Sequence, residues 1–330
     1  PSKKMYEGQR DTFSLTGQYN LNLDTRVVYG LEHEVDAAEI PSNYHTGTGS
    51  TYTAAKYVTA DEEINSQYID LQFRPFEKLY STIGVRRDKH SIAGSYDTGR
   101  ATLAYKMNGN SKIRSSYGTG LRFPTLNEYY FGSTVLNSST LVPEESTSFD
   151  IGIDQVVPKY NLSLSATFFD IEVENYIGGW ASNKDNGNSY VQKNTSAINY
   201  SRGWELSSKW EPINDLNFNF GFTRTKSYDG STCSNPDDTC NDEMNVRIPR
   251  NAFSSSIVKS FNENFTGTAQ YKYVGERRDY GGSDNGFKQV ILGEYSLFNL
   301  YADYNFPGYK FNVAIKNLLN EDYNEAFNYS

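Results

Sequence analysis

The sequence lacks long apolar runs, has few histidines and cysteines, and carries fewer basic than acidic residues. No stretch reaches the roughly 18 apolar residues of a membrane-spanning helix, and the mean hydropathy is −0.66, which excludes helical spans but not spanning β-strands. Lysine and arginine number 31 against 40 acidic residues, so the sequence argues against a broad nucleic-acid surface. No apolar signal segment follows Pro1, and we expect any export signal to have been removed or to lie upstream.

The same scarcity argues against an enzyme. The three histidines, His33, His45 and His90, are too dispersed to suggest a catalytic triad, and no glycine-rich phosphate loop precedes a helix. An isolated histidine in a strand or loop is more often structural than catalytic. A barrel hydrolase remains a minor alternative, which an assay of lipid or peptide hydrolysis would test.

The only two cysteines, Cys233 and Cys240, lie in a short polar stretch whose spacing fits no zinc site. We expect them to form a disulfide at the tip of an extracellular loop, in an oxidising compartment, although two free thiols remain the alternative. Acidic residues surround the pair: Asp229, Asp237, Asp238, Asp242 and Glu243. They could bind calcium, but a solvated acidic loop is the simpler interpretation, and we expect no other metal or cofactor.

Aromatic residues and strict alternation dominate what is present. The 330 residues include 27 Tyr and 19 Phe. This content of large apolar side chains is too high for a disordered chain. Along 216–223, for example, Leu and Phe alternate with Asn, Gly and Thr, and 162–168, 265–273 and 298–306 repeat the pattern. This period of two residues predicts β-strands with one apolar, aromatic face and one polar face. A soluble sandwich would show the same alternation.

The lengths of the strands and connections favour a membrane barrel over a sandwich. We predict fourteen strands, near 11–23, 25–36, 65–75, 78–88, 98–107, 111–121, 145–155, 161–174, 198–211, 215–228, 247–261, 264–279, 291–306 and 309–317. Many exceed ten residues, the length with which a tilted strand crosses a bilayer. Tight turns near Asp24, Pro75, 108–110, Pro158, Pro212, 262–263 and 307–308 alternate with long polar connections at 37–64, 89–97, 122–144, 175–197, 229–246 and 280–290. This alternation of short turns with long connections is typical of outer-membrane barrels.

Four motifs then carry a family resemblance. They are YGTGLRFPTLNEYY at 117–130, LVPEES at 141–146 followed by FDIG at 149–152, RGWEL at 202–206, and IKNLLNEDY at 315–323. In this order they resemble the wall of TonB-dependent outer-membrane receptors, most closely the vitamin B12 (cobalamin) receptor branch. Most of these residues also have a structural interpretation. Pro124 would end a strand, Gly118 and Gly120 would allow close approach, and Asn317 and Asp322 would satisfy turns.

The resemblance implies an all-β transmembrane antiparallel barrel in a Gram-negative outer membrane. Family members have about 22 strands, and this chain would form the wall over 1–330, without the N-terminal plug, the early strands or the last strand. Both termini would then be extracellular, with strands 11–23 and 309–317 as unpaired edges. The implied function is uptake of a scarce nutrient, with a cobalamin-like ligand favoured over a siderophore or haem. The implied partners are outer-membrane lipid, the nutrient ligand, and TonB, which would act through the plug. Nucleic acid is not expected as a partner.

The residues expected to face the ligand share aromatic character and a position on the long connections. They are Tyr129, Tyr130, Phe131, Trp180, Tyr190, Tyr228 and Tyr280. Aromatic and amide groups would give apolar contact and directional hydrogen bonds without chemistry on the ligand. A passive diffusion porin or a surface adhesin barrel is the alternative from another class, and an upstream plug with a TonB-binding box would exclude the porin.

Overall fold

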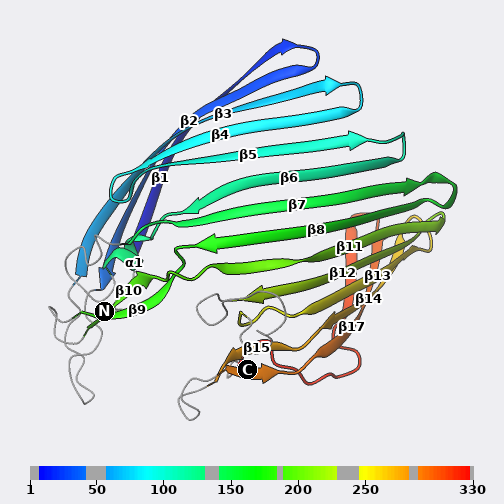
Figure 1. The fold of residues 1–330 in the computed structure, drawn as a ribbon. Coiled ribbons are helices and arrows are strands. Elements are labelled where there is room, and N and C mark those ends of the chain that lie inside the picture. Colours follow the sequence, from blue (N-terminus) through cyan, green and yellow to red (C-terminus); the bar gives the residue numbers. More distant parts are fainter. Residues whose placement is uncertain are drawn as a thin grey trace. The chain divides into compact units, whose positions relative to one another are not determined.

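The computed structural model describes residues 7–41, 57–130, 141–183, 189–228, 245–281 and 289–327. Within them, fourteen strands form one sheet whose order follows the sequence, from β1 to β8, then β11 to β14, then β17 and β18 (Figure 1). The pairs β1–β2, β2–β3, β3–β4, β11–β12, β12–β13, β13–β14, β14–β17 and β17–β18 are all antiparallel. The predicted fold class is therefore confirmed, and β1 and β18, the strands expected to be edges, lie at the two ends of this order.

The long strands account for most of the described chain. They are β1 (Glu7–Asn22), β2 (Thr25–Pro41), β3 (Tyr57–Phe76), β4 (Leu79–His90), β5 (Gly94–Lys106), β6 (Ser111–Arg122), β7 (Glu144–Val157), β8 (Leu162–Glu174), β11 (Asn199–Ile213), β12 (Leu216–Tyr228), β13 (Asn251–Ser260), β14 (Phe265–Val274), β17 (Tyr295–Phe306) and β18 (Tyr309–Ile315). Every predicted strand range overlaps one of them.

Smaller elements lie in the connections. A short helix α1 (Leu126–Tyr130) follows β6, and a 3-10 turn (Pro158–Tyr160) joins β7 to β8. Two extra hairpins are β9 (Ile177–Asn183) with β10 (Ser189–Asn194), and β15 (Arg277–Tyr280) with β16 (Gln289–Leu292). None of the helical segments in the described part of the chain is long enough to cross a membrane.

Several predicted boundaries differ from the structure, and three of the differences change the connections. The connection placed at 89–97 is a three-residue turn between His90 and Gly94, because Nδ1 of His90 accepts hydrogen bonds from the N–H groups of Ile92 and Ala93 at 3.0 and 3.1 Å. The connection placed at 37–64 is shorter, because β2 and β3 stay paired as far as Pro41 and Tyr57. The strand predicted over 264–279 ends at Val274, and the residues after it form the separate hairpin of β15 and β16.

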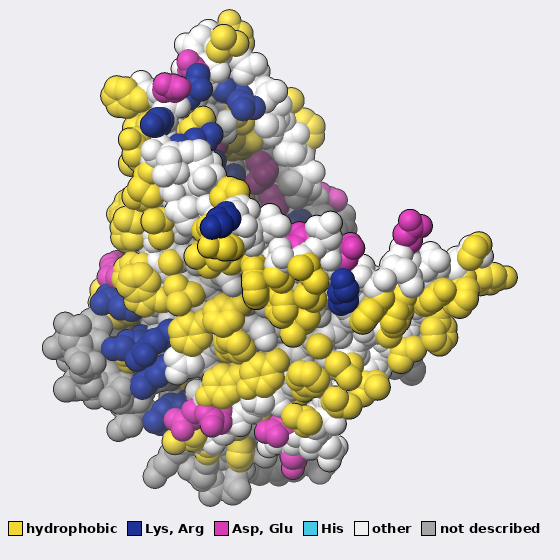
Figure 2. Space-filling view, turned by 90° about the vertical axis from the view of Figure 1, so that its right-hand side faces the viewer, with side chains coloured by type: hydrophobic (Ala, Val, Ile, Leu, Met, Phe, Trp, Pro, Cys, Tyr) yellow, Lys and Arg dark blue, Asp and Glu magenta, His cyan; other side chains and the backbone are white. Residues whose placement is uncertain are grey.

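Alternation gives the sheet an apolar face and a polar face. On β11 and β12, Leu206 lies opposite Phe222 and Trp210 opposite Phe218, whereas Ser207 lies opposite Gly221 on the other face. The apolar side chains remain accessible, with Trp204 53% and Phe220 41% exposed. Figure 2 shows such hydrophobic side chains gathered over much of the surface that it presents. We call these two sides the apolar face and the polar face.

The packing divides the chain into two units, which we describe separately. The first unit comprises Pro1–Leu103, Ser116–Ser148 and Glu172–Asn199. The second unit comprises Ala104–Ser115, Phe149–Ile171 and Tyr200–Ser330. Each unit contains one cluster of polar contacts at the base of the connections, and these clusters are described next.

Candidate functional site

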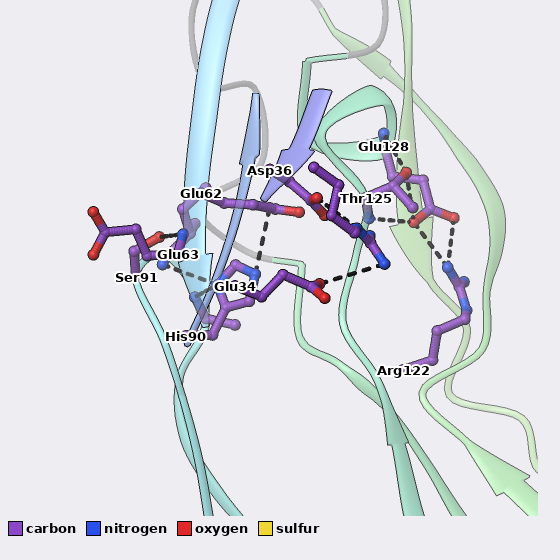
Figure 3. A network of polar contacts seen from close by, with 12 residues as sticks. Glu34, Asp36, Glu62, Glu63, His90, Ser91, Arg122, Thr125 and Glu128 are labelled. Carbon is purple, nitrogen blue, oxygen red and sulfur yellow. Dashed lines mark hydrogen bonds and ion pairs between the residues drawn. The ribbon is translucent and has the colours of Figure 1, made fainter. Parts of the chain in front are cut away.

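In the first unit, Arg122 at the end of β6 joins two carboxylates, those of Glu144 and Glu128, and Figure 3 shows Arg122 beside Glu128. Its Nε and Nη2 donate to the two oxygens of Glu144 at 2.7 and 2.5 Å, and its Nη1 donates to Glu128 at 2.9 and 3.1 Å. The side chains of Glu144 and Glu128 are only 10% and 14% exposed. Two nearly buried carboxylates therefore depend on one guanidinium, whose planar fork suits bidentate pairing.

The motif that contains Arg122 also builds the start of α1. Oγ1 of Thr125 accepts the N–H of Glu128 at 3.2 Å, while the carboxylate of Glu128 accepts the N–H of Thr125 at 2.8 Å. This reciprocal pair is a capping box, in which two helix-start donors are satisfied by side chains. Leu126 then packs against Ala60 of β3, beside Ala38 of β2. The motif thus fixes α1 against the polar face of β2 and β3.

A small apolar cluster holds the next segments to α1. Tyr129 is fully buried and packs with Leu141 and Ile177. The N–H of Ile177 donates to Oε1 of Glu144 at 2.8 Å, and Asn194 of β10 exchanges two 2.9 Å hydrogen bonds with the backbone of Val142. The residues before β7, helix α1 and the hairpin of β9 and β10 are therefore held together. We call Arg122, Glu128, Tyr129, Glu144 and Ile177 the loop-base cluster.

A buried polar group lies beside the loop-base cluster. The His90 side chain is 0% exposed, stacks on Phe123 with ring centroids 4.6 Å apart, and places Nε2 3.3 Å from Oε2 of Glu62. Because Nδ1 of His90 accepts two backbone N–H groups, its proton lies on Nε2. The phenol of Tyr129 has its pKa raised, mainly by burial and then by the Glu62 carboxylate. Tyr129 therefore stays neutral.

Ion pairs continue along the polar face of the first unit. Arg10 meets Asp36 at 2.5 Å and Glu34 at 3.4 Å. Arg86 meets Asp88 at 2.8 Å and Glu32 at 3.1 Å, and Arg100 meets Asp70 at 2.7 Å. In Figure 3, Glu34, Asp36 and Glu62 lie on one side of the view, and Arg122 and Glu128 lie on the other. This face therefore presents paired charges of both signs and can recognise polar groups.

The polar face of the second unit has a comparable arrangement. Arg114 of β6 donates to Oγ1 of Thr167 at 2.5 Å and to Asp154 at 3.3 Å, and it lies 3.7 Å from Asp150. A groove of about 440 Å³ lies beside it, and its polar lining includes Ser207, Thr223 and Lys272. Hydroxyl, carboxylate and ammonium groups make this groove suited to a polar ligand or to a polar protein surface.

A second polar cluster ties three segments of the second unit at Asp279 in β15. The carboxylate is buried and accepts the N–H of Phe327 at 2.7 Å, the N–H of Tyr280 at 2.8 Å and Nε of Arg247 at 3.0 Å. Burial alone would raise the pKa of Asp279, but these hydrogen bonds outweigh it and lower the pKa. We call Asp279 and these three partners the Asp279 cluster.

We expect acid to release residues 321–327 from β15. The pKa of Asp279 is lower in the folded state than in the unfolded state. Its carboxylate therefore stabilises the fold fully at pH values above the unfolded-state pKa, and this stabilisation is lost as the pH falls through the folded-state pKa. Hydrogen exchange measured by mass spectrometry should therefore show these residues protected at neutral pH and opening only below about pH 4. Asp279→Asn should weaken them by about 2 kcal/mol at neutral pH, and the difference from wild type should shrink as the pH falls below about 4, because the wild-type carboxylate is then protonated as well. Asp322→Asn, at an exposed acidic residue of the same segment, is the matched control and should behave as wild type.

The residues expected to face the ligand fall into different environments, and their ligand contact stays a prediction. Tyr129 is fully buried, Tyr228 is 3% exposed, Tyr130 is half-buried and Tyr280 is 56% exposed. Trp180 and Tyr190 lie in the paired backbones of β9 and β10, and Phe131 lies outside the described residues. The structure brings Tyr129, Tyr130 and the β9–β10 hairpin together in the first unit and places Tyr228 and Tyr280 in the second.

The predictions on the acidic connection lie outside the described residues. Cys233, Cys240 and the five acids between Asp229 and Glu243 fall there, so the disulfide and calcium binding stay predictions. Within the described ranges, no group of three or more His, Cys, Asp or Glu side chains is arranged to hold a metal ion. The sequence analysis treated His90 only as a structural histidine, and it did not single out Glu62 or Asp279, because their partners His90 and Phe327 lie far away in the chain.

Gly120, Gly203 and Asn317 of the motifs have structural roles, whereas a Cβ at Gly118 would lie no closer than 3.5 Å to a neighbour, so the close approach expected there is not found. A Cβ at Gly120 would lie 2.8 Å from Oγ of Ser146, and one at Gly203 would meet the backbone of Arg224 and the Phe169 ring. Asn317, at φ 51°, accepts the N–H of Glu321 at 2.8 Å and donates to its carbonyl at 2.9 Å. These motif residues shape the wall and its turns.

An antiparallel sheet of long strands, with apolar and polar faces and these motif contacts, defines the wall of a receptor barrel. Residues 2–318 match the family model described as TonB dependent receptor-like, beta-barrel, and the chain belongs to this family.

Among curated proteins, the chain is similar to "Vitamin B12 transporter BtuB" of Vibrio vulnificus. The two are 24% identical over 274 residues, which cover 83% of this chain and 40% of the relative. The protein of the same name from Photobacterium profundum is 26% identical over 129 residues, 39% of this chain and 20% of that protein. This chain thus spans less than half the length of these relatives.

Solved structures agree on the fold. The siderophore receptor PirA from Acinetobacter baumannii superposes with a TM-score of 0.74 at 15% identity, covering 95% of this chain and 50% of that one. A mutant of the ferric enterobactin receptor PfeA from Pseudomonas aeruginosa gives 0.75 at 16% identity, covering 94% and 48%. At these identities the likeness supports the fold alone.

Proposed function

We propose that this chain is part of the wall of a Gram-negative outer-membrane receptor that captures a scarce nutrient and imports it with energy from TonB. The observation that carries the proposal is the family match over residues 2–318. The two faces of the sheet support it, since lipid requires an apolar outer surface and a polar ligand requires a polar inner one. TonB would act through a plug domain encoded outside these residues.

Within that class, we propose a cobalamin-like ligand over a siderophore or haem. The support is that both curated relatives described above are named vitamin B12 transporters, one of them matching 83% of this chain. The siderophore receptors resemble the chain at 15–16% identity and support the architecture only. The ligand would be bound without chemical change, by the side chains of the connections and the polar face.

The loop-base cluster would serve this function by positioning the connections. It holds α1 and the β9–β10 hairpin through one arginine, two carboxylates and the buried Tyr129. A binding surface on long connections needs such a rigid base, because ordering mobile loops at the moment of binding lowers affinity. Transport would then depend on Arg122, Glu128 and Glu144 as positioning residues.

The test uses the complete receptor expressed from its gene. Calorimetric titration should detect cyanocobalamin and neither ferric enterobactin nor haem, and a strain in which the gene is deleted should lose cobalamin uptake that depends on TonB. Binding of a ferric siderophore alone would reject the ligand and keep the receptor class. Diffusion of small sugars through the protein without TonB would instead indicate a porin and reject the class.

A further inference from the structure

A hollow lies on the polar face of the first unit, between two arginines of neighbouring strands. Its volume is about 280 Å³, and its lining includes Asp70, Gly84, Arg86, Thr98 and Arg100. Neither the four sequence motifs nor the loop-base cluster contains any of these residues. The side chains of Arg86 and Arg100 are 36% and 58% exposed, so a ligand in the hollow can reach both guanidinium groups. We call this site the Arg86–Arg100 hollow.

A glycine of β4 makes room for the ion pair on one side of the hollow. Gly84 lies directly opposite Asp70 of β3, and a Cβ at Gly84 would overlap Oδ1 of that carboxylate. Because glycine has no side chain, the Asp70 carboxylate lies across β4 and accepts Nε and Nη2 of Arg100 at 3.2 and 2.7 Å. Gly84 therefore allows Asp70 to fix the orientation of Arg100.

Each arginine keeps one nitrogen for a further acceptor. Arg86 donates through Nε to Asp88 at 2.8 Å and through Nη2 to Glu32 at 3.1 Å. Arg100 uses Nε and Nη2 for the two oxygens of Asp70. Within the described part of the chain, Nη1 of each guanidinium therefore makes no hydrogen bond. The hollow thus offers hydrogen-bond donors that the wall itself does not use.

The charges around the hollow favour a neutral acceptor over an anion. The two guanidinium groups are paired with three carboxylates, those of Glu32, Asp70 and Asp88, so their positive charge is already compensated. A further carboxylate or phosphate would be repelled by these acids. A carboxamide adds no charge, since its carbonyl accepts from a guanidinium and its N–H groups can donate to Asp70 or to the hydroxyl of Thr98.

We propose that the Arg86–Arg100 hollow binds a carboxamide group of the transported nutrient, whose carbonyl oxygen accepts hydrogen bonds from the free Nη1 groups. This inference rests on the proposed function, because a nutrient that moves along the polar face would reach the hollow, and it names a chemical group that the nutrient carries. Cobalamins carry several carboxamide side chains around the corrin ring. A ligand that presents only carboxylates would bind less well here.

The first experiment measures the affinity of the complete receptor for cyanocobalamin by calorimetric titration. Arg100→Lys keeps the positive charge beside Asp70 but loses Nη1, and because one hydrogen bond from a charged donor is removed, the affinity should fall roughly tenfold. Arg10→Lys, on β1 of the same face and outside the hollow, is the matched control and should bind as wild type does. Unchanged affinity in Arg100→Lys, or an equal loss in Arg10→Lys, would overturn the proposal.

The second experiment does not depend on which nutrient is transported. Phenylglyoxal modifies accessible guanidinium groups, and peptide mass spectrometry measures the rate of modification at Arg86, Arg100 and Arg10. Propionamide should slow the reaction of Arg86 and Arg100 at a lower concentration than propionate does, and it should leave Arg10 unaffected. An equal or stronger effect of propionate would overturn the proposal.

Two further outcomes of these experiments have separate meanings. If Arg86 and Arg100 fail to react before any ligand is added, another part of the receptor fills the hollow, and the proposal is overturned. If cyanocobalamin fails to bind the wild-type receptor, the proposed nutrient is rejected, and the comparison of propionamide with propionate alone decides whether the hollow takes a carboxamide.

Discussion

Replacing Arg122 by alanine should loosen three segments of the first unit at once. The change leaves Glu144 and Glu128, which are 10% and 14% exposed, without their shared cation. Removing one partner of a buried pair costs about 3–5 kcal/mol, and because Arg122 itself is 43% exposed we expect about 3 kcal/mol. Hydrogen exchange should increase together at residues 123–130, at residues 141–147 and at the amide of Ile177.

The control for this variant is Arg10→Ala on β1. Arg10 also pairs with two carboxylates, but its side chain is 62% exposed, so the loss should stay below about 1 kcal/mol. Glu144→Gln should fall between the two, because the amide oxygen still accepts the N–H of Ile177 while the charge is lost. Local opening confined to β6 in Arg122→Ala would show that the cluster does not connect the segments.

A charge placed on the apolar face should cost far more than the same charge on the polar face. Phe220, in the middle of β12, is 41% exposed, and its ring centroid lies 4.9 Å from that of Phe253. The adjacent Asn219 points to the other face, where its side-chain amide donates a hydrogen bond to Oγ of Ser256. Arginine at a lipid-facing position near the bilayer centre costs about 2–4 kcal/mol. Folding titrations into lipid vesicles should therefore show Phe220→Arg strongly destabilised and Asn219→Arg close to wild type.

A second pair of positions repeats this test on β17. Leu300→Arg should match Phe220→Arg, since Leu300 lies opposite Ala269 on the apolar face. Asn299→Arg is a less clean control, because Oδ1 of Asn299 accepts the N–H of Asn317 at 2.8 Å and the variant also loses this turn contact. Equal destabilisation of Phe220→Arg and Asn219→Arg would show that the assignment of the two faces is wrong.

The sequence predicted the sheet well because its signal is local. Alternation with a period of two residues is readable within each strand, and all fourteen strands of the sheet were found from it. Helix α1 was missed because five residues are too few to show a helical period, although Thr125 and Glu128 already had the spacing of a capping box. The turn after His90 was missed because a side chain satisfies its backbone groups.

The candidate site was predicted only in part. The motifs contained Arg122, Glu128 and Glu144, but the sequence does not show that one arginine joins both acids. Glu62 meets His90, and Asp279 meets Phe327, across long stretches of chain, and no local pattern marks such pairs. Residue type and position on a long connection selected Tyr129 as a ligand contact, whereas its fully buried position depends on Leu141 and Ile177 packing around it.

The sequential order of the sheet has a consequence for how the wall is assembled. Because each long strand lies beside the next long strand along the chain, no pairing within this order requires closure of more than one connection. Low sequence separation of contacts favours rapid folding, even in an all-β protein. Because of this sequential order, duplication or deletion of one hairpin, such as β13 with β14, would change the number of strands in the sheet without changing the order of the remaining strands. A wall of this design can vary in strand number during evolution through single local events.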